Sequence, residues 1–418
     1  MMRIEKLTRA VMEKLLRSRS LRDRDAARIA ARIIADVRRR VDRALVEWTM
    51  RLDGTDISAG KTWIRRREFS AAVRTADVGF VRAIRHAARN IRRVAEKQMP
   101  RPWTLDTEPG VRISQIVRPI ESIGCYIPGG RFSLVSTLLM TVIPAQVAGV
   151  PRIVIVCPKP SPELFVAAKF LGVDSIARVG GAQAIAALAY GTRSIPRVDK
   201  IFGPGNRYVA AAKQLVSADC AIDLNAGPTE AVILAEHGDP RWIAADLLAQ
   251  AEHAPDAGSF LVTTKPSLAR AVQQAIATQL TALPASNPAH RSIIRAGAIL
   301  LAPSLNSATA FINRFAPEHL SLFNSEREIL RGISAAGTIF LGPWSAQPLG
   351  DYSSGSNHVL PTATWARTRG GLSAADFVKC INVQSISAAG FARLAPAAQS
   401  LARAEGLAAH ENAVEVRR

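Results

Sequence analysis

The chain has 418 residues, of which 48% are hydrophobic and 21% charged, as in an ordinary globular protein with two or three structural units. Its formal net charge is +20, and residues 1–118 carry 29 lysines and arginines against 14 acidic residues. The excess is almost all arginine on amphipathic patterns without interleaved aromatic residues, which favours solvated helix faces over a nucleic-acid interface. Nucleic-acid binding therefore remains a minority hypothesis.

Export and membrane insertion are not expected. The best apolar run, STLLMTVIPAQVAGVPRIVIVC, is interrupted by prolines, a glutamine and an arginine, and the charged first twenty residues have no signal-peptide core. Four cysteines are scattered without CxxC spacing, which argues against a thiolate metal site: Cys125, Cys157, Cys220 and Cys380. We expect a cytoplasmic protein.

In chain order, the first hundred residues predict helices, because apolar residues recur every three or four positions in LVEWTMRL and FVRAIRHAARNIRRVAEKQM. GVRISQIVRPI then has the β-branched content of a strand. From there strand-like and helix-like segments alternate, as in RIVIVCP before SPELFVAAKFLGV and KIFGPGN before RYVAAAKQLVSA. The tail from Ser373 is again helical. This alternation predicts an α/β fold, with parallel sheets wound with helices on both faces.

Three turns between predicted strands and helices are rich in glycine: CYIPGG, VGGAQA and FGPGNRY. The dinucleotide fingerprint GxGxxG is absent, but small residues at such turns let a phosphate or polar ligand approach a helix N-terminus. One such turn is usually no more than a turn. Three in succession at the carboxyl ends of strands indicate a ligand crevice.

Side chains that suit a metal occur in three later segments. LLAQAEH places Gln250 and His253 on one face of a predicted helix, although a polar stripe near a helix end explains an isolated pair equally well. The Gly-rich loop GDYSSGSNHVLP carries Asp351, and EGLAAH near the end carries His410. Two imidazoles, a carboxylate and an amide oxygen form a plausible set for zinc or another borderline metal, but their spacing does not show that they converge.

FAPEHLSL places Glu318 directly before His319 in a chain with seven histidines. Neighbouring residues point in different directions on a strand or a helix, so an acid that only orients its base is expected elsewhere in the chain. Pro317 and Glu318 also suit the first turn of a helix. Taken alone, a helix start is the better explanation of this pair.

Together these segments resemble histidinol dehydrogenase. YIPGG, VGGAQAIAALAYGT, FGPGNRYV, DLNAGPTE, ADLLAQAEH, APEHL, GDYSSGSNHVLPT and EGLAAH occur in the order and spacing of that family, over essentially the whole chain. The resemblance implies two incomplete Rossmann-like units with small helical N- and C-terminal extensions, in an intertwined homodimer. The implied division is an N-terminal extension of residues 1–21, a first domain of 22–125 plus 231–372, a second domain on the NAD side of 126–230, and a C-terminal extension of 373–418 that completes the partner's site.

The resemblance also implies an activity, namely zinc-dependent oxidation of L-histidinol through L-histidinal to L-histidine with reduction of two NAD, which ends histidine biosynthesis. The implied catalytic residues are Glu318 and His319. One zinc ion per subunit would be held by Gln250, His253, Asp351 and His410. Substrate contacts would come from these four ligands together with Thr229, His319 and Glu405. NAD contacts would come from Tyr126, Gln183 and Asn206.

This chemistry gives the adjacent pair a purpose. The alcohol step needs a base for the hydroxyl proton, and an imidazole suits it because its pKa lies near working pH. The aldehyde step needs a base that activates water, and a carboxylate suits that. We therefore expect His319 to act on the alcohol and then on the hydrate, and Glu318 to act on the water.

Departures from the family pattern leave every implied functional position filled. Thr229 stands where many members have serine, which keeps the hydroxyl, and Ala254 stands where glycine is common. Such changes bear more on the exact substrate than on the reaction, so a paralogue that oxidises another amino- or acid-substituted alcohol is the alternative. His358 stays open between a loop-stabilising role and a ligand contact.

Overall fold

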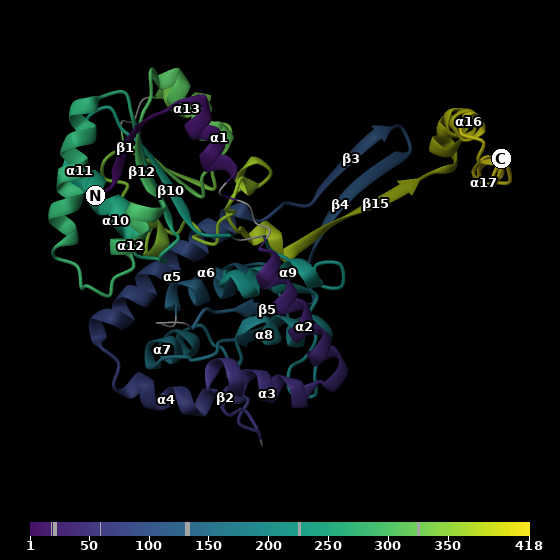
Figure 1. Ribbon diagram of the computed structural model, residues 1–418. Helices are drawn as coiled ribbons and strands as arrows, with labels where there is room; N and C mark the ends of the chain where they lie inside the picture. The colour runs from purple at the N-terminus through teal and green to yellow at the C-terminus, as the bar shows by residue number, and fades with distance from the viewer. Residues whose placement is uncertain (18, 20–22, 59, 130–133, 225–226, 324–326) are drawn as a thin grey trace.

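The computed structural model describes residues 1–17, 19, 23–58, 60–129, 134–224, 227–323 and 327–418. It contains two six-stranded sheets with helices on both faces and an arm built on a third, three-stranded sheet (Figure 1). The expected α/β fold with parallel sheets is confirmed. In the described part of the chain, no helix is long and apolar enough to cross a membrane. Gly130 of YIPGG and Asn225 and Ala226 of DLNAGPTE lie outside the described residues.

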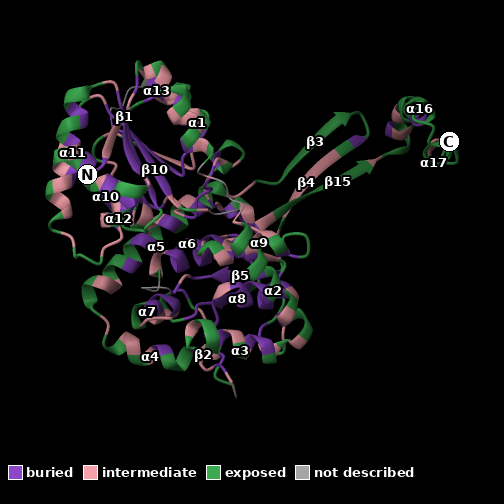
Figure 2. Cartoon of the chain, in the orientation of Figure 1, coloured by how far each residue is buried: buried purple, intermediate pink, exposed green. Residues whose placement is uncertain are grey.

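The first sheet, called the β5 sheet, consists of β2 (Trp63–Arg65), β5 (Ser122–Tyr126), β6 (Arg152–Val156), β7 (Ser175–Ala177), β8 (Lys200–Phe202) and β9 (Ala221–Ile222). Its strand order is β2-β7-β6-β5-β8-β9, and all neighbours are parallel except the edge strand β2. The central strand β5 is buried along its whole length because helices cover both faces (Figure 2).

Two groups of helices pack on the β5 sheet, one on each face, and each group forms an apolar core with the strands. One face carries α2 (Arg24–Arg40), α3 (Asp42–Asp53), α8 (Gly181–Tyr190) and α9 (Arg207–Val216). The other face carries α4 (Arg66–Arg74), α5 (Val78–Gln98), α6 (Val135–Val147) and α7 (Pro162–Phe170).

The second sheet, called the β10 sheet, consists of β1 (Arg3–Lys6), β10 (Glu230–Leu234), β11 (Gly258–Thr263), β12 (Gly297–Leu301), β13 (His319–Leu322) and β14 (Thr338–Leu341). Its order is β1-β12-β11-β10-β13-β14, and every pair of neighbours is parallel. One core cluster involves α10 (Pro240–Ala251), α11 (Pro266–Leu280) and α12 (Ala289–Arg295). The other involves α1 (Arg9–Arg17), α13 (Leu305–Phe315) and α14 (Arg327–Gly332).

The arm projects from the body of the molecule (Figure 1). The short helices α15 (Gln347–Tyr352), η1 (Trp365–Arg367) and η2 (Ala374–Phe377) precede its last strand. It consists of β3 (Trp103–Glu108), β4 (Val111–Pro119), β15 (Val378–Ile386), α16 (Ala388–Ala404) and α17 (Ala408–Glu415). β4 pairs antiparallel with both other strands, and Figure 2 shows that β3 and β15 are largely exposed.

The sheets divide the chain differently from the expected domains. Helices α2 to α5 lie within 22–125, yet they pack on the β5 sheet with the strands of 126–230 rather than with 231–372. The N-terminal extension is not purely helical, because β1 extends the β10 sheet beside β12. The C-terminal extension is not purely helical either, because β15 pairs with β4 along its whole length.

Candidate active site

The adjacent acid and base lie at the start of β13 and not in the first turn of a helix, so the expected helix start is wrong. Helix α13 ends at Phe315, Ala316 caps it in the left-handed conformation, and His319 is the first residue of β13. Their side chains also converge, since Glu318 Oε2 lies 3.7 Å from His319 Nδ1. Adjacency in the chain therefore does not keep this acid away from its base.

Glu318 is held by the segment that leads into β10. The Thr229 hydroxyl donates to Glu318 Oε2 at 2.5 Å, and the backbone N–H of Glu230 donates to the same oxygen at 3.0 Å. Gln250, in the last turn of α10, donates from Nε2 to Thr229 Oγ1 at 2.8 Å. Its Oε1 accepts a hydrogen bond from Gln347 Nε2 at 2.7 Å. This chain of hydrogen bonds holds the expected site residues Thr229, Gln250 and Glu318, together with Gln347, in one cluster.

His319 lies between two carboxylates. Its Nδ1 faces Glu318, its Nε2 lies 3.8 Å from Asp351 Oδ1, and neither ring nitrogen has a hydrogen-bond partner among the described residues. Burial by itself lowers the pKa of His319, but the two carboxylates outweigh burial and raise the pKa. Burial raises the pKa of Glu318. For Asp351 burial acts upward too, but the neighbouring His319 reverses the direction and lowers the pKa. An imidazole placed in this way can accept and hold a proton from a reacting group.

The groups that hold Glu318 precede strands of the β10 sheet, whereas Asp351 follows its last strand, β14. Thr229 comes just before β10, Gln250 before β11 and Glu318 before β13. The cluster therefore lies at the amino ends of parallel strands. The ligand crevice expected at carboxyl ends concerns the three glycine-rich turns, which follow β5, β7 and β8 of the other sheet.

Two further expected ligands lie close to this cluster. Asp351 is in the short helix α15 and not in the Gly-rich loop itself. His253 lies two residues beyond the end of α10, with Nδ1 3.0 Å from the Ala249 carbonyl, so Nε2 is the nitrogen left for a ligand. His253 acts electrostatically on both Asp351 and Glu318.

The remaining expected ligand, His410, lies in α17, and Glu405 caps the end of α16. Both are exposed on the arm, which projects away from the cluster (Figure 1). One chain therefore does not bring the expected metal and substrate residues together. Within the described residues, no group of three or more His, Cys, Asp or Glu is placed to hold a metal ion.

His358 joins the two sheets beside this cluster. Its Nδ1 lies 2.9 Å from the Asp351 carbonyl, and its Nε2 lies 3.2 Å from Thr137 Oγ1 in the first turn of α6. Burial lowers the pKa of His358. These contacts favour the loop-stabilising role, because they hold the chain at Asp351 against the helix that follows β5.

The expected NAD residues do lie beyond carboxyl ends of strands. Tyr126 ends β5, and its hydroxyl accepts a hydrogen bond from the Gly181 N–H at 3.2 Å. Gln183 follows in α8 and is fully buried, while Asn206 caps the N-terminus of α9. Gly203 has a φ of +110°, and a Cβ there would lie 2.1 Å from the Tyr126 carbonyl oxygen. Glycine thus permits the turn after β8 to approach Tyr126.

A buried ion pair that holds this turn was missed by sequence reasoning. Lys213 Nζ pairs with Asp223 Oδ1 and donates to the Gly203 carbonyl at 2.9 Å, while Asp223 Oδ2 accepts from the Gly203 N–H at 2.7 Å. Both backbone groups of Gly203 are thereby fixed. Lysine and aspartate ten residues apart carry no sequence signal for such a pair. Gln347, which holds Gln250, carried none either.

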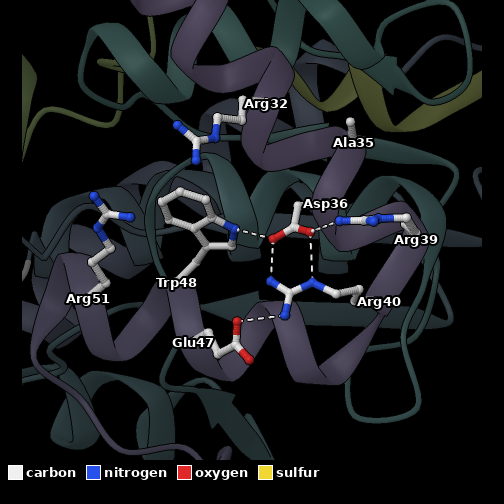
Figure 3. A pocket seen from close by; sticks show the side chains of 8 residues that line it. All are labelled: Arg32, Ala35, Asp36, Arg39, Arg40, Glu47, Trp48 and Arg51. Carbon is white, nitrogen blue, oxygen red and sulfur yellow. Dashed lines mark hydrogen bonds and ion pairs between the residues drawn. The ribbon is translucent and has the colours of Figure 1, made fainter.

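The arginine-rich helices form a separate surface hollow of about 620 Å³ between α2 and α3 (Figure 3). Asp36 accepts from Arg39 and Arg40 and from Trp48 Nε1 at 2.9 Å, and Arg40 also pairs with Glu47. Much of the cationic lining is therefore paired within the hollow. This pairing supports the interpretation of the arginine excess as solvated helix faces.

Comparisons with known proteins agree with one another. The family model for histidinol dehydrogenase matches residues 16–418. The chain is 43% identical over 393 residues to the histidinol dehydrogenase of Vibrio parahaemolyticus, covering 93% of this chain and 90% of that one. It is 45% identical to the enzyme of Halalkalibacterium halodurans, covering 92% of each. The crystal structure of histidinol dehydrogenase from Elizabethkingia anophelis is 35% identical, with a TM-score of 0.94 over 100% of this chain and 98% of that one. The chain belongs to the histidinol dehydrogenase family.

Proposed function

We propose that the protein oxidises L-histidinol through L-histidinal to L-histidine, with reduction of two NAD, as a zinc-dependent histidinol dehydrogenase. The observation that carries the proposal is the buried cluster of Glu318, His319, Gln250 and Asp351 in a chain that matches the family almost from end to end. The reaction completes histidine biosynthesis, and we expect it to occur in the cytoplasm.

The side chains of the cluster fit zinc in their chemistry. Imidazole, carboxylate and amide oxygen are ligands for a borderline metal. Gln250 Oε1 uses one lone pair on Gln347, which leaves the other for an ion, and His253 has its Nε2 available. We assign the metal to Gln250, His253, Asp351 and His410. The bound ion would hold the substrate in place through the imidazole and amine nitrogens of L-histidinol.

His319 and Glu318 would divide the proton transfers. His319 takes the proton of the alcohol hydroxyl and later that of the hydrate, since its open ring nitrogens and neighbouring carboxylates favour a charged imidazole. Glu318 takes a proton from the water that adds to the aldehyde, and its raised pKa makes it a stronger base than an ordinary carboxylate. Thr229 orients Glu318 and, with Glu405, contributes to substrate binding.

We assign the NAD contacts to Tyr126, Gln183 and Asn206, beyond the carboxyl ends of β5, β7 and β8. Gln183 Oε1 is buried and has no hydrogen-bond partner among the described residues. This open acceptor and the tight glycine turn at Gly203 suit a cofactor that approaches the backbone closely. NAD bound there would accept the hydride.

Each parallel sheet fits an incomplete Rossmann-like unit. The orders β7-β6-β5-β8-β9 and β12-β11-β10-β13-β14 both follow the pattern 3-2-1-4-5, one strand short of the complete fold.

We further propose a homodimer in which the arm of one subunit supplies Glu405 and His410 to the site of the other. The arm exposes apolar side chains that a monomer would leave in water, among them Trp103 at 45%, Leu401 at 65% and Val416 at 69%. The body exposes apolar side chains near Asp351 as well, including Trp344 at 78% and Tyr352 at 62%. A two-fold dimer would cover both surfaces at once.

The activity is tested by following NADH during complete oxidation of a limiting amount of L-histidinol. We expect two NADH per substrate, loss of activity on chelation and recovery with Zn²⁺. Because an amide oxygen is an unusual zinc ligand, Mn²⁺ or Co²⁺ should also substitute. One NADH per substrate, or faster oxidation of another amino alcohol, would favour a paralogue's reaction. Full activity in metal-free protein would exclude the metal assignment.

The shared site is tested with two inactive variants. His410→Ala damages the arm and His319→Ala damages the body, so each dimer should be inactive. After subunit exchange, about half the dimers are mixed, and each mixed dimer holds one complete site and one doubly damaged site. Activity should return to roughly a quarter of wild type. If mass measurement verifies exchange and no activity returns, the arm does not complete the partner's site.

A further inference from the structure

Asp53 lies beside the expected NAD residues, although no sequence motif pointed to it. It is the last residue of α3, which packs on α8 (Figure 1). Gln183 Nε2 donates a hydrogen bond to Asp53 Oδ2 at 3.2 Å. The same carboxylate acts electrostatically on Tyr126. Asp53 therefore belongs to the group of side chains around the N-terminus of α8.

Within the described part of the chain, the charge of Asp53 has no ion-pair partner. Two other carboxylates of this region are paired, Asp36 with Arg40 and Asp56 with Lys61. Among the described residues, no Lys, Arg or His nitrogen lies within 4.0 Å of the Asp53 carboxylate. Burial raises the pKa of Asp53, and Lys159 opposes that rise only from a greater distance. A partly desolvated carboxylate with an open oxygen is ready to accept hydrogen bonds from a ligand.

The strand order places Asp53 on one particular side of the β5 sheet. The order β7-β6-β5-β8-β9 has its switch point between β5 and β8, where a dinucleotide lies across the carboxyl ends of the strands. In such sheets the adenosine half lies over the first strand and its neighbours on the side of the second and third, here β6 and β7. Lys159 follows β6 and Gln183 follows β7, and both flank Asp53.

We propose that Asp53 accepts hydrogen bonds from the adenosine ribose hydroxyls of NAD and selects NAD over NADP. The inference rests on the proposed assignment of Tyr126 and Gln183 to NAD. A carboxylate matches a ribose diol because it offers two acceptor oxygens to two donors. The 2′-phosphate of NADP offers no donor at neutral pH and would meet a like charge in a partly desolvated place.

The other interpretation is that Asp53 only orients Gln183. The two interpretations differ in a measurable way, because an orienting residue affects both dinucleotides equally. Calorimetric dissociation constants for NAD and NADP should be measured on wild type, Asp53→Asn and Asp56→Asn. Asp56→Asn is the matched control, since it makes the same chemical change three residues away, where the carboxylate pairs with Lys61.

We expect wild type to bind NAD at least about tenfold more tightly than NADP, as the loss of hydrogen bonds to a charged group implies. Asp53→Asn should weaken NAD binding by about tenfold and bring the NADP to NAD ratio of dissociation constants close to one. Asp56→Asn should leave that ratio at the wild-type value. Equal weakening of both dinucleotides in Asp53→Asn would overturn the proposal.

Two further readouts keep the test decisive. If the melting temperature shows that Asp53→Asn does not fold, Asp53→Ser replaces it. A wild type that binds NAD and NADP equally tightly overturns the proposal without any variant. Failure of the proposed function is recognised separately. In that case the wild type neither binds NAD nor forms NADH from L-histidinol, whereas failure of the Asp53 assignment leaves both intact.

Discussion

Breaking the buried pair of Lys213 and Asp223 should destabilise the protein strongly. Their side chains are 3% and 0% exposed, so Lys213→Met leaves a carboxylate without its ion-pair partner and with almost no access to water. Asp223 would keep two backbone donors, the N–H of Gly203 at 2.7 Å and that of Leu224 at 2.6 Å. These cannot replace the lost ammonium group. Removing one partner of a buried ion pair costs about 3–5 kcal/mol, and we expect Lys213→Met to fall in that range.

The double variant Lys213→Met/Asp223→Asn separates the charge from the shape of the site. It removes both charges, while the asparagine oxygen still accepts from a backbone N–H. We expect it to recover more than half of the lost free energy of unfolding, because the buried uncompensated charge is gone. Urea unfolding at one fixed protein concentration measures all variants, since association would otherwise change the midpoint. A loss below about 1 kcal/mol in Lys213→Met, or a double variant no more stable than the single one, would refute this reasoning.

Three further predictions concern single positions. Glu318→Gln should slow aldehyde oxidation by roughly 10²–10⁴ and alcohol oxidation far less, whereas His319→Ala should slow both; equal losses for Glu318→Gln would contradict the division of roles. Gly203→Ala should weaken NAD binding in calorimetry and lower stability by more than about 1 kcal/mol, because its Cβ would overlap the Tyr126 carbonyl at a positive φ. Burial raises the pKa of Asp246 to about 6, so its ionisation opposes folding as pH rises from 4 to 6. Asp246→Asn should therefore stabilise by about 2–3 kcal/mol at pH 8 and by less than about 1 at pH 4 in urea unfolding, and equal effects at both pH values would count against it.

The alternation of strands and helices was predictable wherever a segment is buried on both faces. RIVIVCP gave β6, GAQAIAALAY gave α8 and RYVAAAKQLV gave α9, because a continuous apolar run or an apolar helix has few other places in a folded chain. Asn206 directly precedes the predicted helix RYVAAAKQLVSA, and its side chain caps α9 by accepting from the Tyr208 and Val209 N–H groups. Local pattern and local structure agree at such positions.

Strands that depend on distant partners were not predictable. β1 is the four-residue segment RIEK, whose only reason to be a strand is its pairing with β12 almost 300 residues later. β15 was expected to be helical, because nothing within it indicates its nine-residue ladder with β4. Its side chains are mostly exposed, so they lack the apolar content that marks a buried strand. Pairing across the chain decided both elements.

The candidate site shows the same limit. The residue types for acid–base and metal chemistry could be recognised as isolated pairs, and family resemblance gave them roles, but their convergence depends on hydrogen bonds between distant segments. Thr229, Gln250 and Glu318 come from three segments that precede different strands of the β10 sheet, namely β10, β11 and β13. Asp53 had no signal, because its significance comes only from where α3 packs.

The two sheets face each other with opposite ends of their strands, and this explains why neither sheet alone could carry out the proposed reaction. The acid–base cluster lies at the amino ends of β10, β11 and β13, whereas the expected NAD residues lie beyond the carboxyl ends of β5, β7 and β8. His358 connects them, since it contacts the Asp351 carbonyl on one side and Thr137 of α6 on the other. Because α6 begins just after β5, the carboxyl ends of the strands of the β5 sheet are held against the amino ends of the strands of the β10 sheet. If NAD binds as proposed, a substrate held by the cluster would reach a cofactor held by the β5 sheet, and in the proposed homodimer the arm that projects from between the two sheets would reach the neighbouring subunit.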